Sequence, residues 1–176
     1  MPKLIVLTGS PGVGKSSVLH ELATRGFQCF EEPARKILHH QLKIDGPALP
    51  SKDPELFVRA LLKDIEQSHQ SAKESGKDVV FFDRAFPDLF MYCACFNVDP
   101  RILKDWEATL VYSKKVFLFP IWEEIFVNDE LRKMPFEESF VRKKELITAY
   151  DRLGYTLIDV PKCSVEDRAE FLLSKI

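Results

Sequence analysis

Gly9-Ser10-Pro11-Gly12-Val13-Gly14-Lys15-Ser16 is the most informative stretch of the chain. It matches the pattern G-x-x-x-x-G-K-[ST] at every fixed position. Glycines let a backbone curl so that successive N–H groups point inward toward an anion. A helix that starts at the end of such a loop presents its positive N-terminus to the same anion. The stretch therefore predicts a phosphate-binding loop.

The residues on either side of this loop have the secondary structure that the pattern requires. Leu4 to Thr8 is a short apolar run rich in branched residues, which is typical of a parallel strand covered on both faces. Lys15 to Arg25 places apolar residues at helical spacing and ends before Gly26, a common C-terminal stop. A strand, a glycine loop and a helix in this order distinguish a P-loop from a chance glycine turn.

The loop residues have expected roles toward a nucleoside triphosphate. Lys15 would reach the β- and γ-phosphates, and the Ser16 hydroxyl would bind Mg²⁺. ATP is expected rather than GTP, since no Asn-Lys-x-Asp follows a strand to read guanine. The predicted nucleotide-binding residues are Gly9, Ser10, Pro11, Gly12, Val13, Gly14, Lys15, Ser16 and Ser17.

Apolar strands and helices alternate along the rest of the chain. Further strands are expected at Phe27–Phe30, Val79–Phe82, Val116–Phe119 and Tyr155–Val160. Further helices are expected over Ala34–Lys43, from Pro54 toward Ser75, and after the capping sequence Ser164-x-x-Asp167. This alternation predicts an α/β fold with a mainly parallel sheet.

Composition sets the limits of the prediction. A chain of 176 residues with 45% apolar residues fits one domain over residues 1–176. With 25 Lys and Arg against 27 Asp and Glu, the net charge of −2 gives no protein-wide basic field, so nucleic acid is not an expected partner. No apolar run approaches the roughly 20 residues that a bilayer crossing needs. The four cysteines lack the paired spacing of a disulfide scaffold, which favours a reduced, cytoplasmic compartment.

Asp83 and Arg84 follow the apolar run Val79–Phe82, at a strand end where ligands of α/β proteins bind. The Asp83 carboxylate would hold magnesium-bound water or accept a proton from an attacking hydroxyl. Arg84 would brace an anion or the acid, and Asp88 lies four residues further on. The alternatives are a carboxylate that caps a turn and a solvated arginine.

Glu32 and Arg35 follow the second expected strand and so can point into the same crevice at the carboxyl edge of the sheet. Glu32 would orient or deprotonate an acceptor hydroxyl, or it is an acid that favours the start of a helix. The segment from Trp122 to Lys144 is dense in both charge signs and is either a surface helix pair or a lid. In a lid, Arg132 would supply positive charge to the transferring phosphoryl group; otherwise it lies on a solvated helix.

These pieces together resemble the small P-loop ATPase and kinase family that includes the ribosylnicotinamide kinase domain of NadR-type proteins. More distantly, the chain is similar to nucleoside and nucleotide kinases. The matching pieces are Gly9 to Ser16, Glu32-x-x-Arg35, Phe82-Asp83-Arg84-x-x-x-Asp88, Asp129-x-x-Arg132, and Leu153-Gly154-Tyr155 leading to Val160-Pro161. One position departs from the family, because Glu130 stands where members often have glycine.

The resemblance implies a P-loop three-layer sandwich with a five-stranded parallel sheet, ATP with Mg²⁺, and a small helical lid within 122–144 that carries Arg132. It also implies an acceptor site near Glu32, Asp83 and Arg84. The expected catalytic residues are Lys15, Asp83, Arg84, Arg132 and Glu32. The expected substrate-binding residues are Glu32, Arg35, Arg84 and Asp88, and the expected magnesium ligands are Ser16 and Asp83.

A small-molecule kinase is the leading functional hypothesis. It would pass the γ-phosphoryl group of Mg·ATP to a hydroxyl of a nucleoside-like or vitamin-like molecule. The alternatives are an NTP hydrolase or nucleotide-dependent switch that acts on a partner, and a nucleotide-binding scaffold with negligible turnover. Acceptor-dependent release of ADP would separate the first hypothesis from the other two.

Overall fold

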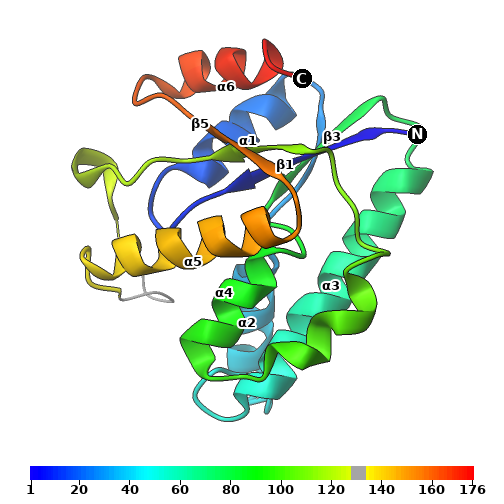
Figure 1. Ribbon diagram of the computed structural model, residues 1–176, viewed down its shortest axis with the longest axis vertical. Helices are drawn as coiled ribbons and strands as arrows, with labels where there is room; N and C mark the ends of the chain where they lie inside the picture. The colour runs from blue at the N-terminus through cyan, green and yellow to red at the C-terminus, as the bar shows by residue number, and fades with distance from the viewer. Residues whose placement is uncertain (128–133) are drawn as a thin grey trace.

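Five strands pair side by side, all in parallel, in the order β2-β3-β1-β4-β5 (Figure 1). Their bounds are β1 Lys3–Thr8, β2 Gln28–Phe30, β3 Val79–Asp83, β4 Lys115–Leu118 and β5 Thr156–Asp159. This computed structural model describes residues 1–127 and 134–176. The α/β fold with a parallel sheet, predicted from the alternating sequence pattern, is confirmed, and so are the five strands implied by the resemblance.

Six α-helices lie in the described residues, and four of them were predicted, namely those near 15–25, 34–43 and 54–75 and the helix after Ser164. Their bounds are α1 Lys15–Thr24, α2 Pro33–Lys43, α3 Pro54–Glu74, α4 Asp88–Phe96, α5 Glu138–Arg152 and α6 Val165–Leu173, with 3-10 helices at Pro100–Trp106 and Glu123–Ile125. The Asp53 side chain caps α3 by accepting a hydrogen bond from the backbone N–H of Leu56 at 2.9 Å. Of the helices in the described residues, none is long and apolar enough to cross a membrane.

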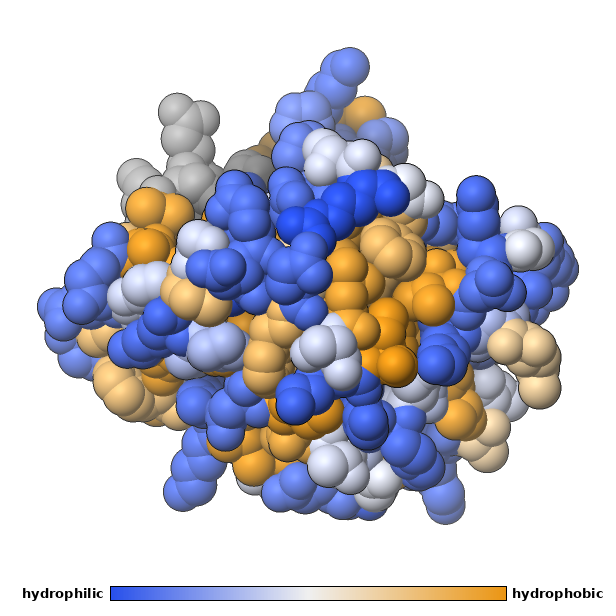
Figure 2. Space-filling view, turned by 90° about the horizontal axis from the view of Figure 1, so that it is seen from above, coloured by the Kyte–Doolittle hydropathy of each residue, from blue (hydrophilic) through white to orange (hydrophobic). Residues whose placement is uncertain are grey.

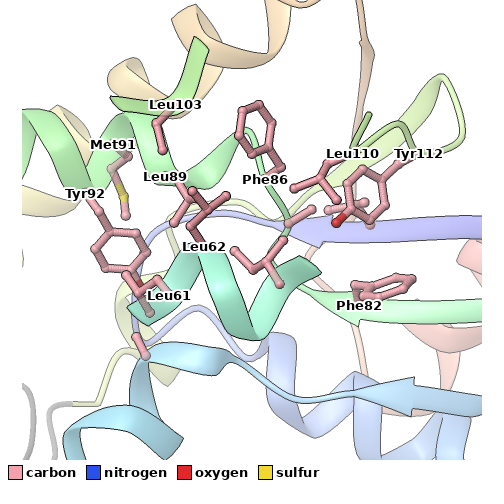
Figure 3. Packing of buried hydrophobic residues seen from close by; sticks show 14 of the residues in the cluster. Leu61, Leu62, Phe82, Phe86, Leu89, Met91, Tyr92, Leu103, Leu110 and Tyr112 are labelled. Atoms are coloured by element: carbon pink, nitrogen blue, oxygen red, sulfur yellow. The ribbon is translucent and has the colours of Figure 1, made fainter. Parts of the chain in front are cut away.

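The three central strands, β1, β3 and β4, are mostly apolar and buried because helices cover both faces of the sheet (Figure 1). Along β1, Leu4 and Val6 point into a cluster formed with α3, α4 and α5, whereas Ile5 and Leu7 point toward α1 and α6. Figure 3 shows side chains of the first cluster, among which Leu61, Leu62 and Leu89 lie close together. These two cores hold the carboxyl ends of β1 and β3 at fixed positions.

The second core reaches the surface on the side of the molecule that carries α6. Seen from that side, apolar side chains gather within a mostly polar surface (Figure 2). Phe171 and Ile176 are among the partly buried side chains that pack against this core.

The strand order places a crevice beside the P-loop. From β1 the chain runs to β2 on one side of the sheet, whereas from β3 it runs to β4 on the other side. Adjacent parallel strands whose connections leave in opposite directions open a crevice at their carboxyl ends, where α/β proteins bind ligands. Leu7 on β1 pairs with Asp83 on β3, so the P-loop and Asp83 lie at this point.

Candidate functional site

The loop between β1 and α1 has a backbone conformation that only glycine adopts easily. Gly12 and Gly14 have φ angles of 77° and 83°, in the left-handed region. A Cβ atom on Gly12 would lie 2.9 Å from the carbonyl oxygen of Val127. Gly14 is also the N-cap of α1, so the loop leads directly into the positive end of that helix.

Lys15 lies over the loop rather than in solvent. Its side chain is 4% exposed, and its Nζ donates hydrogen bonds to the carbonyl oxygens of Gly9 at 3.2 Å and Ser10 at 3.1 Å. The same nitrogen is 4.0 Å from Oδ1 of Asp83. The structure therefore joins the end of β3 to the P-loop, as the shared sheet edge predicts.

Asp83 is an enclosed carboxylate at the carboxyl end of β3, with 1% of its side chain exposed. Ser16 Oγ donates a hydrogen bond to its Oδ2 at 2.9 Å, whereas its Oδ1 has no hydrogen-bond partner among the described residues. Burial raises the pKa of Asp83 above the usual aspartate value, and the nearby Lys15 ammonium opposes part of this rise. The unsatisfied oxygen is a position for an incoming cation or proton.

The donor atoms at this point fit a magnesium ion. The Ser16 hydroxyl and the Asp83 carboxylate supply the hard oxygen ligands that Mg²⁺ prefers. The described residues contain no group of three or more His, Cys, Asp or Glu side chains able to hold a metal ion. The pair formed by Ser16 and Asp83 nevertheless matches the usual pattern for Mg²⁺, which takes one or two protein ligands and completes its shell with phosphate and water.

Glu32 lies between β2 and α2, and its side chain is 3% exposed. Its Oε1 accepts hydrogen bonds from Arg84 Nε and from the Tyr92 hydroxyl, both at 2.8 Å. Its Oε2 is 4.0 Å from Nε of Arg35, whose side chain is half exposed. Two buried donors therefore fix one oxygen of Glu32, and the other lies on the side of Arg35.

Arg84 is held in an unusual conformation. Its φ of 74° lies in the left-handed region, which a residue with a long side chain rarely adopts, and such outliers cluster at functional sites. Burial alone would lower the pKa of Arg84, but Tyr92, Glu32 and Asp88 raise it well above the ordinary value. The guanidinium thus stays charged between two carboxylates, at 2.8 Å from Glu32 and 3.0 Å from Asp88.

Asp88 is fully buried, and both of its carboxylate oxygens are engaged by the protein. Oδ1 accepts from Thr8 Oγ1 at 2.7 Å and from Arg84, and Oδ2 accepts from the Ala85 backbone N–H and the Tyr150 hydroxyl. Neither Asp88 nor Arg84 is among the described residues that line the cavity at the P-loop. The side chains of Arg84 and Asp88 face inward, where Arg84 holds Glu32, and the substrate contacts expected of these two residues stay predictions.

A cavity of about 1050 Å³ connects the predicted nucleotide and acceptor residues. Gly12 to Ser17 form one wall, and Glu32, Arg35 and Asp83 lie along the same space. Further basic groups of α2 also line it: Lys36, His39, His40 and Lys43. Its volume is slightly above the usual range for small-molecule sites, which leaves room for both a nucleotide and an acceptor.

Arg132 lies outside the described residues, so its predicted contact with the nucleotide stays a prediction. The described residues before it do reach the site, because Ile125 and Val127 line the cavity. After it, the Ser10 hydroxyl donates a hydrogen bond of 2.6 Å to the carbonyl oxygen of Ser139 in α5. Both described ends of the segment 122–144 therefore contact or border the P-loop.

The sequence reasoning missed Arg168, which lines the cavity from α6 and is 4% exposed. A signal was present, because Arg168 shares a helical face with the inward-facing Leu172 and Val165. It also missed Tyr92 and Tyr150, whose hydroxyls bind Glu32 and Asp88. Those two tyrosines lie in runs that read as ordinary apolar helix faces.

The sequence of the chain matches one protein-family model over most of its length. A family model described as an AAA domain matches residues 4–168. No match was found among curated protein sequences.

Solved structures share the fold at low sequence identity. A deoxyadenosine kinase from M. mycoides, with products dCMP and a flexible dCDP bound, has a TM-score of 0.65 and 16% identity over 98% of this chain and 97% of its own. NadR protein in complex with NR has a TM-score of 0.70 and 17% identity over 98% of this chain and 50% of its own. NadR in complex with NAD and AMP-PNP gives 0.67 and 13%, over 98% and 48%. The chain thus spans about half of the NadR chains, and the resemblance inferred from its motifs is confirmed for the fold.

Proposed function

The chain belongs to the AAA-domain family, and on that premise we propose that it is an ATP-dependent phosphotransferase. It would transfer the γ-phosphoryl group of Mg·ATP to a hydroxyl of a small nucleoside-like molecule. The observation that carries the proposal is that the P-loop, Asp83 and the fixed carboxylate of Glu32 line one shared cavity. A protein that only binds nucleotide does not need the second carboxylate, and the acceptor dependence of ADP release separates a kinase from a hydrolase.

The donor end of the cavity would bind the nucleotide. Backbone N–H groups of the loop and Lys15 would hold the phosphates, and Ser16 with Asp83 would hold Mg²⁺. Bound there, Mg²⁺ would neutralise charge on the phosphate oxygens. Lys15 already lies against the loop carbonyl oxygens, so it needs only to turn its ammonium from them toward an incoming phosphate.

Glu32 would act on the acceptor. Arg84 and Tyr92 hold one of its oxygens, and this fixes the carboxylate before substrate arrives. The other oxygen would accept the proton of the acceptor hydroxyl as the new O–P bond forms, the bond to the β-phosphate oxygen breaks and ADP leaves. Arg35 at the edge of the cavity would contact the acceptor.

A nucleoside-like acceptor is favoured by the structures that share the fold. One of them is a deoxyadenosine kinase, and another is in complex with NR. Exposed basic side chains of α2 also line this cavity, and their charge would favour a phosphate group on the acceptor. A phosphorylated nucleoside is therefore a further acceptor of the same class.

Release of ADP from Mg·ATP, measured with a panel of nucleosides and nucleoside monophosphates, tests the proposal. We expect release to depend on one class of acceptor and to be abolished by Lys15→Ala. Lys63→Ala, at an exposed position on α3, is the matched control and should keep wild-type activity. Equal release with and without every acceptor would contradict the proposal and indicate a hydrolase. No release at all would indicate a binding protein.

A further inference from the structure

The described residues bury three lysine or arginine side chains, and one of them differs from the others. Lys15 lies 4.0 Å from Asp83, and Arg84 is paired with Glu32 and Asp88. Arg168 is 4% exposed, yet no carboxylate of the described residues lies within ion-pair distance of it. A buried cation with no counter-ion is costly, so its retention requires an explanation.

The hydrogen bonds of Arg168 do not explain why its charged side chain is buried. Its Nε donates only to the carbonyl oxygen of Ser164 in the preceding turn, at 3.3 Å. Its Nη1 is enclosed and has no hydrogen-bond partner in the described part of the chain. Burial lowers the pKa of Arg168 below the ordinary arginine value. The side chain thus has donor capacity that the protein itself does not use.

Aromatic rings hold this guanidinium beside the P-loop. Its central carbon is 6.0 Å from the ring centre of Phe119 and 5.6 Å from that of Trp122. Its Nη1 would lie 2.8 Å from a Cβ atom placed on Gly14, the N-cap of α1. Arg168 also lines the same cavity as the loop. The unpaired N–H groups of Arg168 Nη1 therefore lie beside the N-terminus of α1, where the fold already attracts an anion.

We propose that Arg168 binds the polyphosphate chain of the donor nucleotide. Its positive charge would add to the charge that the P-loop supplies from one side of the phosphates. A guanidinium has fixed, forked donors that match phosphate oxygens. The inference rests on the proposed function, because it assigns a second nucleotide-binding element at the same site. The anion would in turn compensate the buried charge of Arg168.

Nucleotide binding by Arg168→Met tests this directly, because methionine keeps much of the apolar bulk and removes the charge. We expect Kd for Mg·ATP and Mg·ADP to rise about tenfold or more, the scale of a lost charge-assisted hydrogen bond, with adenosine binding unchanged. The unfolding temperature of the ligand-free variant should equal or exceed that of the wild type. Arg168→Lys, which keeps the charge without the fork, should lie between the two.

Arg152→Met is the matched control. Arg152 also lies over an aromatic ring, 4.1 Å from the centre of Phe90, but it is half exposed and paired with Glu107. Its substitution should leave nucleotide affinity unchanged.

Two results would overturn the inference: wild-type ATP affinity in Arg168→Met, whatever its unfolding temperature, or an equal loss of affinity for adenosine. The first, with affinity still lost in Lys15→Ala, would refute the role of Arg168 alone. Absence of nucleotide binding by the wild type would refute the proposed function as well.

Discussion

The buried carboxylate of Asp83 destabilises the ligand-free protein and is also the group that we propose holds Mg²⁺. Its carboxylate is enclosed, one of its oxygens has no hydrogen-bond partner among the described residues, and burial raises its pKa. Lys15 at 4.0 Å compensates the charge only in part. In the ligand-free protein an ionised Asp83 is therefore destabilising, and a bound cation would remove that penalty.

Asp83→Asn should separate stability from activity. The amide removes the enclosed charge but also the nearby carboxylate that Lys15 faces at 4.0 Å, so the two effects oppose each other and the unfolding temperature of the ligand-free variant should change little. Turnover should fall about 10²-fold or more, the usual effect of removing a group that moves protons or orients a metal ion. Steady-state kinetics and thermal unfolding measure the two effects. Asp78→Asn, at an exposed position just before the same strand, is the control, and near wild-type turnover in Asp83→Asn would reduce Asp83 to a structural role.

Glu32→Gln should lower kcat without weakening nucleotide binding. Glutamine can still accept the hydrogen bonds of Arg84 and Tyr92 but cannot take a proton from the acceptor. We expect kcat to fall about 10²-fold, with the Kd for Mg·ATP within twofold of wild type, roughly the precision of such comparisons. Glu55→Gln, on the surface of α3, is the matched control. An unchanged kcat would show that Glu32 serves the fold alone.

At the level of single residues, the sequence predicts which residues meet but not which way each one faces. Lys15, Ser16 and Asp83 meet because parallel strands end at one edge, and this follows from their positions alone. The inward direction of Arg84 and Asp88 depends on a positive φ and on hydroxyl groups from distant helices. No local pattern contains that information.

At the level of elements, most helices and strands could be predicted, because each has a local cause. The four-residue apolar run of β3, the proline after Asp53 and the capping serine at 164 all mark elements that the structure contains. The 3-10 helix over Pro100–Trp106 was not predicted, since it packs only Leu103 fully inward and has no clear apolar period. The irregular course around Glu123–Ile125 likewise depends on contacts with the P-loop region.

Gly12→Ala tests the conformation of the P-loop as an element. Alanine in the left-handed region costs about 1–2 kcal/mol, and a Cβ here would also press on the carbonyl oxygen of Val127 at 2.9 Å. Gly76→Ala is the matched control, because Gly76 has a φ of 69° but nothing within 4 Å of a Cβ. Both variants should lose stability in denaturant unfolding. Only Gly12→Ala should lose nucleotide affinity, and equal affinity in both would contradict the loop assignment.

At the level of the whole molecule, the free energy of unfolding should depend on pH through a buried histidine that does not line the cavity. His69 on α3 is 5% exposed, its Nε2 is 2.9 Å from the carbonyl oxygen of Val111, and its ring meets Tyr112 edge-on. Burial lowers its pKa below the ordinary value of 6.5, and Lys73 acts in the same direction. The unfolded chain therefore binds a proton more readily than the folded protein does.

Stability should consequently fall as the pH drops from about 7 to about 5, because protonation then favours the unfolded state. His69→Gln should lose less stability over that range, as measured by denaturant unfolding at each pH. His40→Gln, at an exposed position on α2, should keep the wild-type slope. Parallel pH profiles for the wild type and His69→Gln would show that other groups set the acid sensitivity.

The fate of the γ-phosphoryl group tests the central claim most directly. Purified protein would be incubated with Mg²⁺ and γ-labelled ATP in the presence of the nucleoside panel, and the labelled products would be separated. The account predicts label in a new phosphomonoester of one acceptor, absent in Lys15→Ala and strongly reduced in Glu32→Gln. Label found only in inorganic phosphate, whatever acceptor is added, would contradict it.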